Sequence, residues 1–127
     1  MAMTSRWLGL LDRRRMWAWL AVLVALVIAL GSLLPGDELP ASLPSDTLNH
    51  LVGYMGLAAL IALSSRRFWW SVILAVGFGL VIEWAQLYVP GRSGGDMLDI
   101  AANAMGALIG AGMMAWLIRA AGSRSNG

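Results

Sequence analysis

The sequence contains no cysteine, no lysine and a single histidine, and charged residues make up only 13% of its 127 residues. The lack of cysteine excludes disulfide bonds and thiolate metal sites. The charged share is about half of the ~25% that is usual in soluble domains. Hydrophobic residues make up 59% of the chain. Because a soluble core of this size cannot hide so much apolar surface, much of it must face lipid.

The basic residues argue against a nucleic-acid partner. All nine are arginines, and they stand in short clusters beside apolar runs. A nucleic-acid footprint gathers on one face instead, whereas this distribution is typical of membrane orientation signals. We therefore expect membrane lipids as partners and no nucleic acid.

Four apolar segments follow one another, separated by Pro, Gly and Arg-rich breaks. We predict transmembrane helices over about 16–34, 47–64, 68–89 and 97–118. Each segment approaches the ~20 residues that a helix needs to cross a hydrocarbon core of ~30 Å. Because backbone groups in lipid must be satisfied internally, these segments must be helical. The prediction is an all-α, polytopic membrane protein in which residues 1–127 form one four-helix bundle.

The arginines also predict the orientation. They precede the first span, lie between the second and third, and follow the fourth: Arg6, Arg13, Arg14, Arg15, Arg66, Arg67, Arg119 and Arg124. The opposite loops are acidic and contain only Arg92. Positively charged loops stay inside, so both termini are expected in the cytoplasm. The alternative is a signal peptide cleaved near Ala29 and Gly31, although its apolar run exceeds the usual ~7–15 residues.

Polar residues interrupt the last three spans, always toward the predicted outer side. An ionisable group at the bilayer centre costs roughly 2.5–3.5 kcal/mol, so it usually faces the bundle interior and indicates function. Helical spacing places these residues on one stripe of each helix. The stripes are Asp46, Asn49, His50 and Gly53; Gly79, Glu83 and Gln86; and Asp96, Asp99, Asn103, Gly106 and Gly110. We expect them to converge on an outward-facing pocket, with the first helix packed alongside through small residues.

The segment from Asp46 to Gly110 resembles the VanZ-like family. The resemblance lies in Asp46 with His50, Ile82-Glu83 with Gln86, Pro90-Gly91-Arg92-Ser93, Asp99 with Asn103, and Gly106 with Gly110. The family often has Lys after the first Asp, where this chain has Thr47, so a cationic partner is absent there. The resemblance implies a bacterial cytoplasmic-membrane protein of the cell envelope, related to a protein associated with teicoplanin resistance. It implies no agreed biochemical mechanism.

Individual residues admit both structural and functional interpretations. Glu83 lies ~10 Å below the end of its helix, and protonation or pairing with Arg92 or His50 would make its burial tolerable. His50 is either an interface residue or an acid/base group, proton carrier or metal ligand. Asp96 is interpreted as a helix N-cap, whereas Asp99 fits both the first-turn dipole and the pocket.

The remaining candidates are polar groups near these residues. Gln86 and Asn103 are expected to form interhelical hydrogen bonds. Arg92 either binds a lipid phosphate or substrate carboxylate, or pairs with a carboxylate of the chain. Ser93 suggests a Ser-His-Asp arrangement, but no nucleophile-elbow sequence surrounds it.

We favour a non-catalytic envelope protein whose pocket binds or shields a lipid-linked headgroup or a glycopeptide at the outer leaflet. The predicted ligand-binding residues are Asp46, His50, Glu83, Gln86, Arg92, Ser93, Asp99 and Asn103. The alternative is a membrane enzyme acting on a lipid or cell-wall precursor headgroup, with Glu83 and His50 as acid/base and Arg92 holding an anion. A transporter is disfavoured because no polar stripe reaches the cytoplasmic side.

The carboxylates near the pocket bear on cofactors. Asp46, Glu83, Asp96 and Asp99 would repel a bare phosphate unless a divalent cation bridged it or some carboxylates were protonated. One histidine with several carboxylates could ligate such a cation, but their spacing is not a metal signature. The sequence therefore predicts neither a metal site nor a cofactor.

Overall fold

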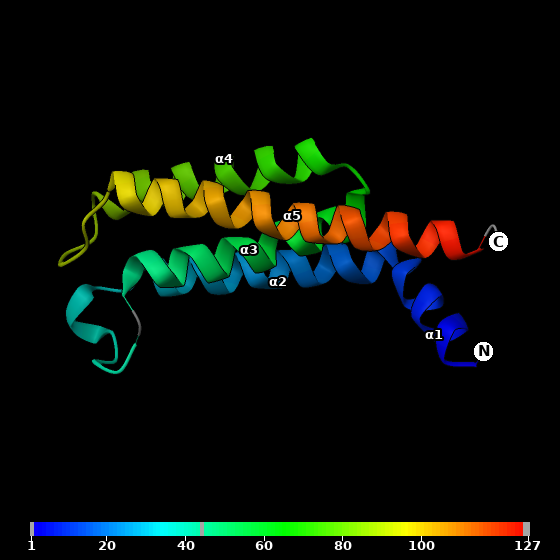
Figure 1. The fold of residues 1–127 in the computed structure, drawn as a ribbon. Coiled ribbons are helices and arrows are strands. Elements are labelled where there is room, and N and C mark those ends of the chain that lie inside the picture. The colour runs from blue at the N-terminus through cyan, green and yellow to red at the C-terminus, as the bar shows by residue number, and fades with distance from the viewer. Residues whose placement is uncertain (1, 44, 126–127) are drawn as a thin grey trace.

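The computed structural model describes residues 2–43 and 45–125, and in this part of the chain it is helical without strands. The helices are α1 (Ala2–Leu11), α2 (Arg14–Leu33), the 3-10 turn η1 (Gly36–Glu38), α3 (Asp46–Ser65), α4 (Phe68–Gln86) and α5 (Met97–Ser125). The helices α2, α3, α4 and α5 are long and apolar enough to cross a membrane. They run side by side, and α1 lies at the same end of the bundle as the end of α5 (Figure 1). The predicted all-α bundle with four spans is confirmed.

Two boundaries differ from the sequence prediction. The third span ends at Gln86 instead of Val89, because the backbone tightens there into successive turns whose N–H groups reach only three residues back. The fourth helix continues beyond the predicted residue 118 to Ser125. The helix α1 was not predicted. It joins the bundle through Trp17, whose indole N–H donates to the carbonyl of Leu10 at 3.0 Å.

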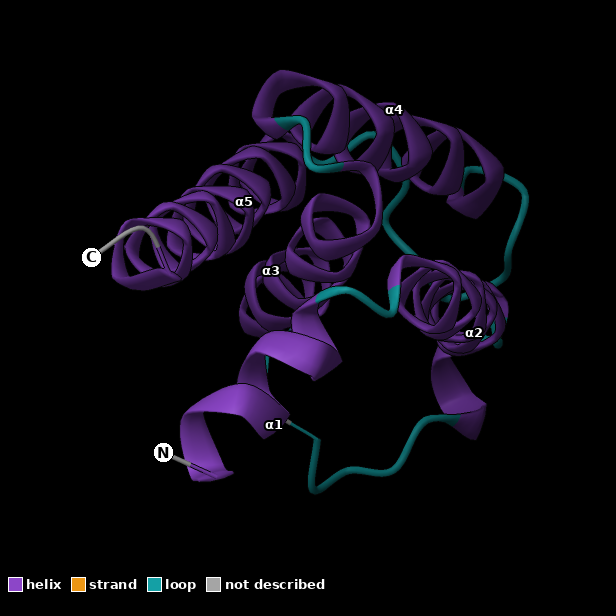
Figure 2. Cartoon of the chain, turned by 90° about the vertical axis from the view of Figure 1, so that its right-hand side faces the viewer, coloured by secondary structure: helices purple, strands orange, loops and turns teal. Residues whose placement is uncertain are grey.

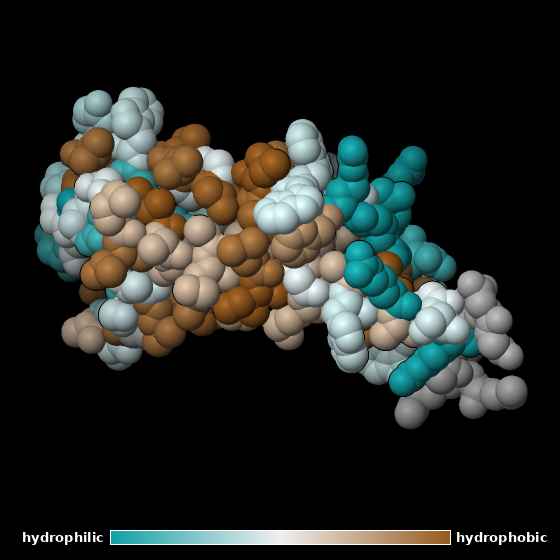
Figure 3. Space-filling view, turned by 45° about the horizontal axis from the view of Figure 1, so that its top comes forward, coloured by the Kyte–Doolittle hydropathy of each residue, from teal (hydrophilic) through white to brown (hydrophobic). Residues whose placement is uncertain are grey.

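The outer surface of the bundle is suited to lipid. Large apolar side chains such as Trp19 and Leu30 are more than two-thirds exposed, at 74% and 71%. Figure 3 shows hydrophobic residues covering the middle of the molecule, with hydrophilic residues gathered toward its ends. An apolar surface of this extent is unfavourable in water and favourable in a bilayer.

The interior is packed with small residues around α3, which lies between α2, α4 and α5 when the bundle is viewed from the end (Figure 2). Ala58, Ala107 and Ala111 are fully buried. A Cβ atom at Gly106 or Gly110 would collide with backbone atoms of α3. The glycine face of α5 therefore packs directly on the α3 backbone, as small residues permit in membrane bundles.

Candidate functional site

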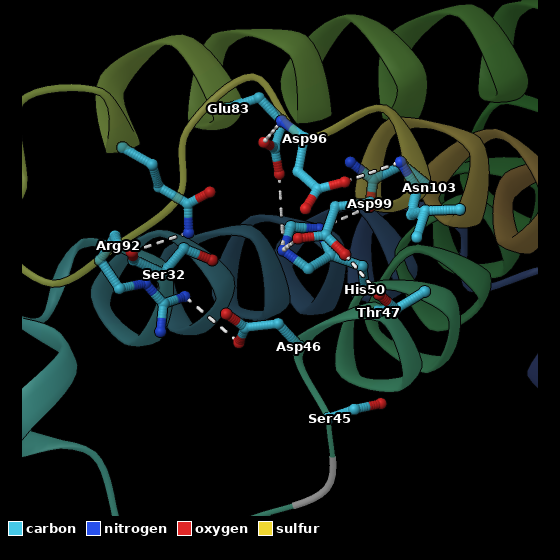
Figure 4. Close-up of polar contacts among 12 residues, drawn as sticks. Ser32, Ser45, Asp46, Thr47, His50, Glu83, Arg92, Asp96, Asp99 and Asn103 are labelled. Carbon is cyan, nitrogen blue, oxygen red and sulfur yellow. Dashed lines mark hydrogen bonds and ion pairs between the residues drawn. The ribbon is translucent and has the colours of Figure 1, made fainter.

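The polar site forms where α3 begins, α4 ends and α5 begins (Figure 4). The side chain of Ser45 caps α3 by accepting from the N–H of Leu48 at 3.3 Å. The side chain of Asp96 accepts from the N–H of Leu98 at 2.8 Å, which confirms it as the N-cap of α5. These caps fix the helix ends, and helical spacing then turns His50, Glu83 and Asp99 inward.

His50 is the centre of the cluster. Its Nδ1 lies 2.7 Å from the Oδ1 of Asn103, and its Nε2 lies 3.6 Å from the Oε1 of Glu83 and 3.9 Å from the Oδ2 of Asp99. All four residues are at most 5% exposed. Because a side-chain amide oxygen only accepts, Nδ1 carries the proton and donates it. In the neutral ring the lone pair is therefore on Nε2, the atom that faces the two carboxylates.

Both carboxylates are held through their other oxygen atoms. The backbone N–H of Asp96 donates to the Oε2 of Glu83 at 3.2 Å, and the hydroxyl of Thr47 donates to the Oδ1 of Asp99 at 2.7 Å. Thr47 was noticed in the sequence only for lacking a positive charge. Its hydroxyl supplies a hydrogen bond where a lysine would supply an ion pair.

Arg92 pairs with Asp46 and not with Glu83. Their Nη2 and Oδ1 atoms are 3.5 Å apart, and the Arg92 side chain is only 5% exposed although it belongs to a loop. The loop is positioned by a hydrogen bond from the N–H of Gly36 to the carbonyl of Pro90 at 3.1 Å. Gly91 has a φ of 72°, which favours glycine. The loop therefore folds over the end of the bundle.

The other predicted residues divide between the interior and the surface. Gln86 is buried and its Nε2 donates to the carbonyl of Ser32 at 3.0 Å, so it links α4 to α2 as an interhelical hydrogen bond. Ser93 is exposed, and in the described part of the chain no hydrogen bond joins it to His50. A Ser-His-Asp arrangement is therefore not formed.

A cavity of about 210 Å³ opens beside the cluster, between α2, α3 and the two loops. Its lining combines an apolar wall with polar groups: Val27, Ile28, Gly31, Ser32, Leu39, Leu43, Asp46, Asn49, His50, Tyr54 and Arg92. The ring of Tyr54 stacks on that of His50, with centroids 5.8 Å apart and an interplanar angle of 2°. The sequence argument overlooked Tyr54, although it follows His50 by one helical turn and so shares its face.

The structure thus brings the three polar stripes together, and Glu83 has His50 as a direct partner at 3.6 Å. His50, Asp46 and Arg92 line the cavity, whereas Glu83 and Asp99 lie beyond it, next to His50. The arrangement can hold a proton between His50 and the carboxylates, or offer nitrogen and oxygen atoms to a cation. The roles of these residues in ligand binding or catalysis stay predictions.

Comparison with known proteins identifies one family. The model of the VanZ/LLP1 family matches residues 41–119, which is more than half of the chain and includes every residue of the buried cluster. No curated protein and no solved structure gave a significant match.

Proposed function

This chain belongs to the VanZ/LLP1 family, and we propose that it binds the polar headgroup of a lipid-linked envelope molecule in the cavity beside His50. The observation that supports this most is the composition of the cavity walls. Val27 and Ile28 of α2 supply apolar surface, while His50, Asp46 and Arg92 supply polar groups. A lipid fits such a cavity because its apolar chain can pack on the apolar wall while its headgroup contacts the polar groups.

Arg92 is the group best suited to recognise the headgroup. Its guanidinium is nearly buried at the cavity and is oriented by Asp46 at 3.5 Å. A guanidinium binds phosphate or carboxylate through parallel hydrogen bonds and keeps its charge at any physiological pH. An anionic headgroup would bind the Arg92 guanidinium and replace part of its ion pair with Asp46.

We place this cavity at the outer leaflet of the bacterial cytoplasmic membrane. The support is the arginine distribution, because the arginine-rich connections lie at the opposite end of the bundle from the cavity. A pocket at the outer leaflet is accessible to lipid-linked cell-wall precursors and to glycopeptides that bind them. Occupying or shielding such a headgroup would contribute to glycopeptide resistance, including resistance to teicoplanin.

An enzyme is the second candidate, and one observation favours it. His50 lines the cavity and has two buried carboxylates within 3.9 Å of its Nε2. A histidine oriented by a carboxylate is suited to proton transfer, because the carboxylate stabilises the imidazolium. In this case Glu83 and His50 would act as acid and base on the headgroup, and Arg92 would hold its anionic group.

Lipid retention tests the proposal. The protein is reconstituted in nanodiscs containing a lipid-linked cell-wall precursor, and bound lipid is measured by native mass spectrometry. We expect Arg92→Gln to retain at least tenfold less precursor than wild type, and Arg119→Gln, at the other end of the bundle, to retain as much as wild type. Equal retention by both variants would show that the cavity is not the headgroup site. Chemical conversion of the precursor during incubation would support the enzyme hypothesis instead.

A further inference from the structure

We propose that His50, Glu83 and Asp99 bind a divalent cation of the Zn²⁺ or Mn²⁺ type. One ligand atom from each residue can be chosen so that all three lie within 4.8 Å of one another. The Nε2 of His50 is 3.6 Å from the Oε1 of Glu83 and 3.9 Å from the Oδ2 of Asp99. Ligands with metal bonds of ~2.1 Å stand about 3.4 Å apart in a tetrahedral site. The observed 3.6 and 3.9 Å separations from Nε2 therefore require only small side-chain shifts.

The hydrogen bonds around the cluster leave these three atoms facing inward. His50 uses its Nδ1 proton for Asn103, which leaves the lone pair of Nε2 toward the carboxylates. Glu83 receives the N–H of Asp96 on Oε2, and Asp99 receives the hydroxyl of Thr47 on Oδ1. Metal ligands are commonly oriented in this way, with the non-ligating atom of each side chain held by a second residue.

An independent observation comes from Glu83. It is 1% exposed, and its Oε1 accepts no hydrogen bond from any residue that the structure describes. A buried carboxylate oxygen that accepts no hydrogen bond, and has only the Nε2 of His50 near it at 3.6 Å, is costly, and the cost is greater inside a membrane. A divalent cation would satisfy this oxygen and balance the charges of Glu83 and Asp99 together.

The ligand types define the class of cation. Mg²⁺ and Ca²⁺ prefer oxygen ligands throughout, whereas an imidazole nitrogen suits Zn²⁺ and similar transition metals. Three protein ligands leave at least one coordination position for another group. Because His50 also lines the cavity, the cation would lie beside the bound headgroup and bridge to its phosphate. This bridging rests on the proposed function, whereas the cation site does not.

Spectroscopy of the wild-type protein tests the site without any substitution. His50 is the only histidine in the chain, so an imidazole nitrogen bound to a metal must come from it when the purification tag contains no histidine. The protein is stripped with EDTA and loaded with Mn²⁺. We expect one ion per chain and a nitrogen coupling, detected by pulsed electron paramagnetic resonance, that changes when ¹⁵N-histidine is incorporated. Absence of binding, or binding without this coupling, would overturn the proposal.

Substitutions test the two carboxylates. Zn²⁺ affinity is measured by calorimetry for Glu83→Gln and Asp99→Asn, with helix content checked by circular dichroism. Matched controls are Glu38→Gln and Asp37→Asn, which change exposed carboxylates at η1. We expect Glu83→Gln and Asp99→Asn to bind Zn²⁺ at least tenfold more weakly than wild type, and this loss of affinity should be the same when Mg²⁺ is present. The two control variants should bind Zn²⁺ like wild type. Equal affinity in all four folded variants would exclude the site.

The cation site and the headgroup site are distinguished by repeating the retention assay with EDTA-treated protein. Retention of the precursor by a wild-type protein that binds no Zn²⁺ would overturn the cation site and support the proposed function. Zn²⁺ binding with no retained precursor would support the cation site and overturn the proposed function. A loss of retention with EDTA that Zn²⁺ restores would support both, and would identify the cation as the bridge to the headgroup.

Discussion

The two ends of the bundle differ in how deeply their polar residues are buried and in what these residues contact. At the end near the chain termini, arginines that are exposed or partly exposed bind backbone carbonyls: Arg14 donates to Ser64 at 2.6 Å and to Ser65 at 3.3 Å, and Arg66 donates to Leu11. At the other end, His50, Glu83 and Asp99 are buried and contact one another. The arginines satisfy backbone carbonyl groups at helix ends, and this structural role is enough to explain them. A buried titratable cluster in a membrane is costly, and such clusters usually have a function.

The largest expected effect concerns the packing that holds the buried cluster together. We expect Gly106→Leu to lower the free energy of unfolding by ~3 kcal/mol or more, because its side chain would collide with the α3 backbone at Leu51. Leu108→Ala is the control, since Leu108 is 43% exposed on the same helix. Thermal unfolding in detergent measures both. Equal losses would mean that the glycine face does not hold α3 and α5 together.

A smaller loss is expected from Asn103→Ala. This change removes the acceptor of the His50 Nδ1 proton, which lies 2.7 Å away in a buried site. A buried donor left without a partner costs ~1–3 kcal/mol. The free energy of unfolding in detergent should fall by this amount, and a Zn²⁺-loaded protein should lose affinity as the imidazole loses its orientation. A neutral result would show that water replaces the amide and that the cluster is less closed than described.

At the arginine end the corresponding change should be mild. We expect Arg14→Ala to cost no more than ~1 kcal/mol, because its bonds to Ser64 and Ser65 are exposed and water can replace them. The same unfolding assay compares it directly with Asn103→Ala. If Arg14→Ala were the more destabilising of the two, the contrast between the two ends of the bundle would be reversed.

Labelling tests which end faces outward without affecting stability. The chain has no native cysteine, so single cysteines report cleanly. Ser42→Cys and Ser93→Cys, both exposed near the buried cluster, should react with a membrane-impermeant thiol reagent in intact cells. Ser123→Cys near the end of α5 should react only after lysis. Gly94 is unsuitable, because a Cβ there would meet the backbone of Leu87 and Glu83. Labelling of Ser123→Cys alone would place the cavity in the cytoplasm.

Most of the fold could be predicted because each span is encoded locally. Apolar runs of sufficient length identified all four spanning helices, although a few polar residues interrupt three of them. The end of α4 could not be predicted, because hydrophobicity does not distinguish a continued helix from the turns that the chain forms at Leu87, Tyr88 and Val89. The helix α1 was missed because its ten residues are too short to span a bilayer, and spanning length is what identified the other helices.

The candidate site was predictable only in part, for a related reason. Helical periodicity places His50, Glu83 and Asp99 on the polar faces of their own helices. It does not set the rotation or depth of one helix against another, so the pairs His50–Asn103, Thr47–Asp99 and Arg92–Asp46 follow only from the assembled bundle. A metal signature was absent for the same reason, since the three ligand candidates come from three different helices.

The claim that the buried cluster is functional is tested most directly by Glu83→Gln. The amide keeps the shape of the side chain and can still accept from the N–H of Asp96. The variant should therefore fold, insert and accumulate like wild type. If the chain acts as proposed, expression of the wild type and of Glu38→Gln should reduce teicoplanin susceptibility, and expression of Glu83→Gln should not. A Glu83→Gln protein of normal abundance that gives full wild-type resistance would contradict the account.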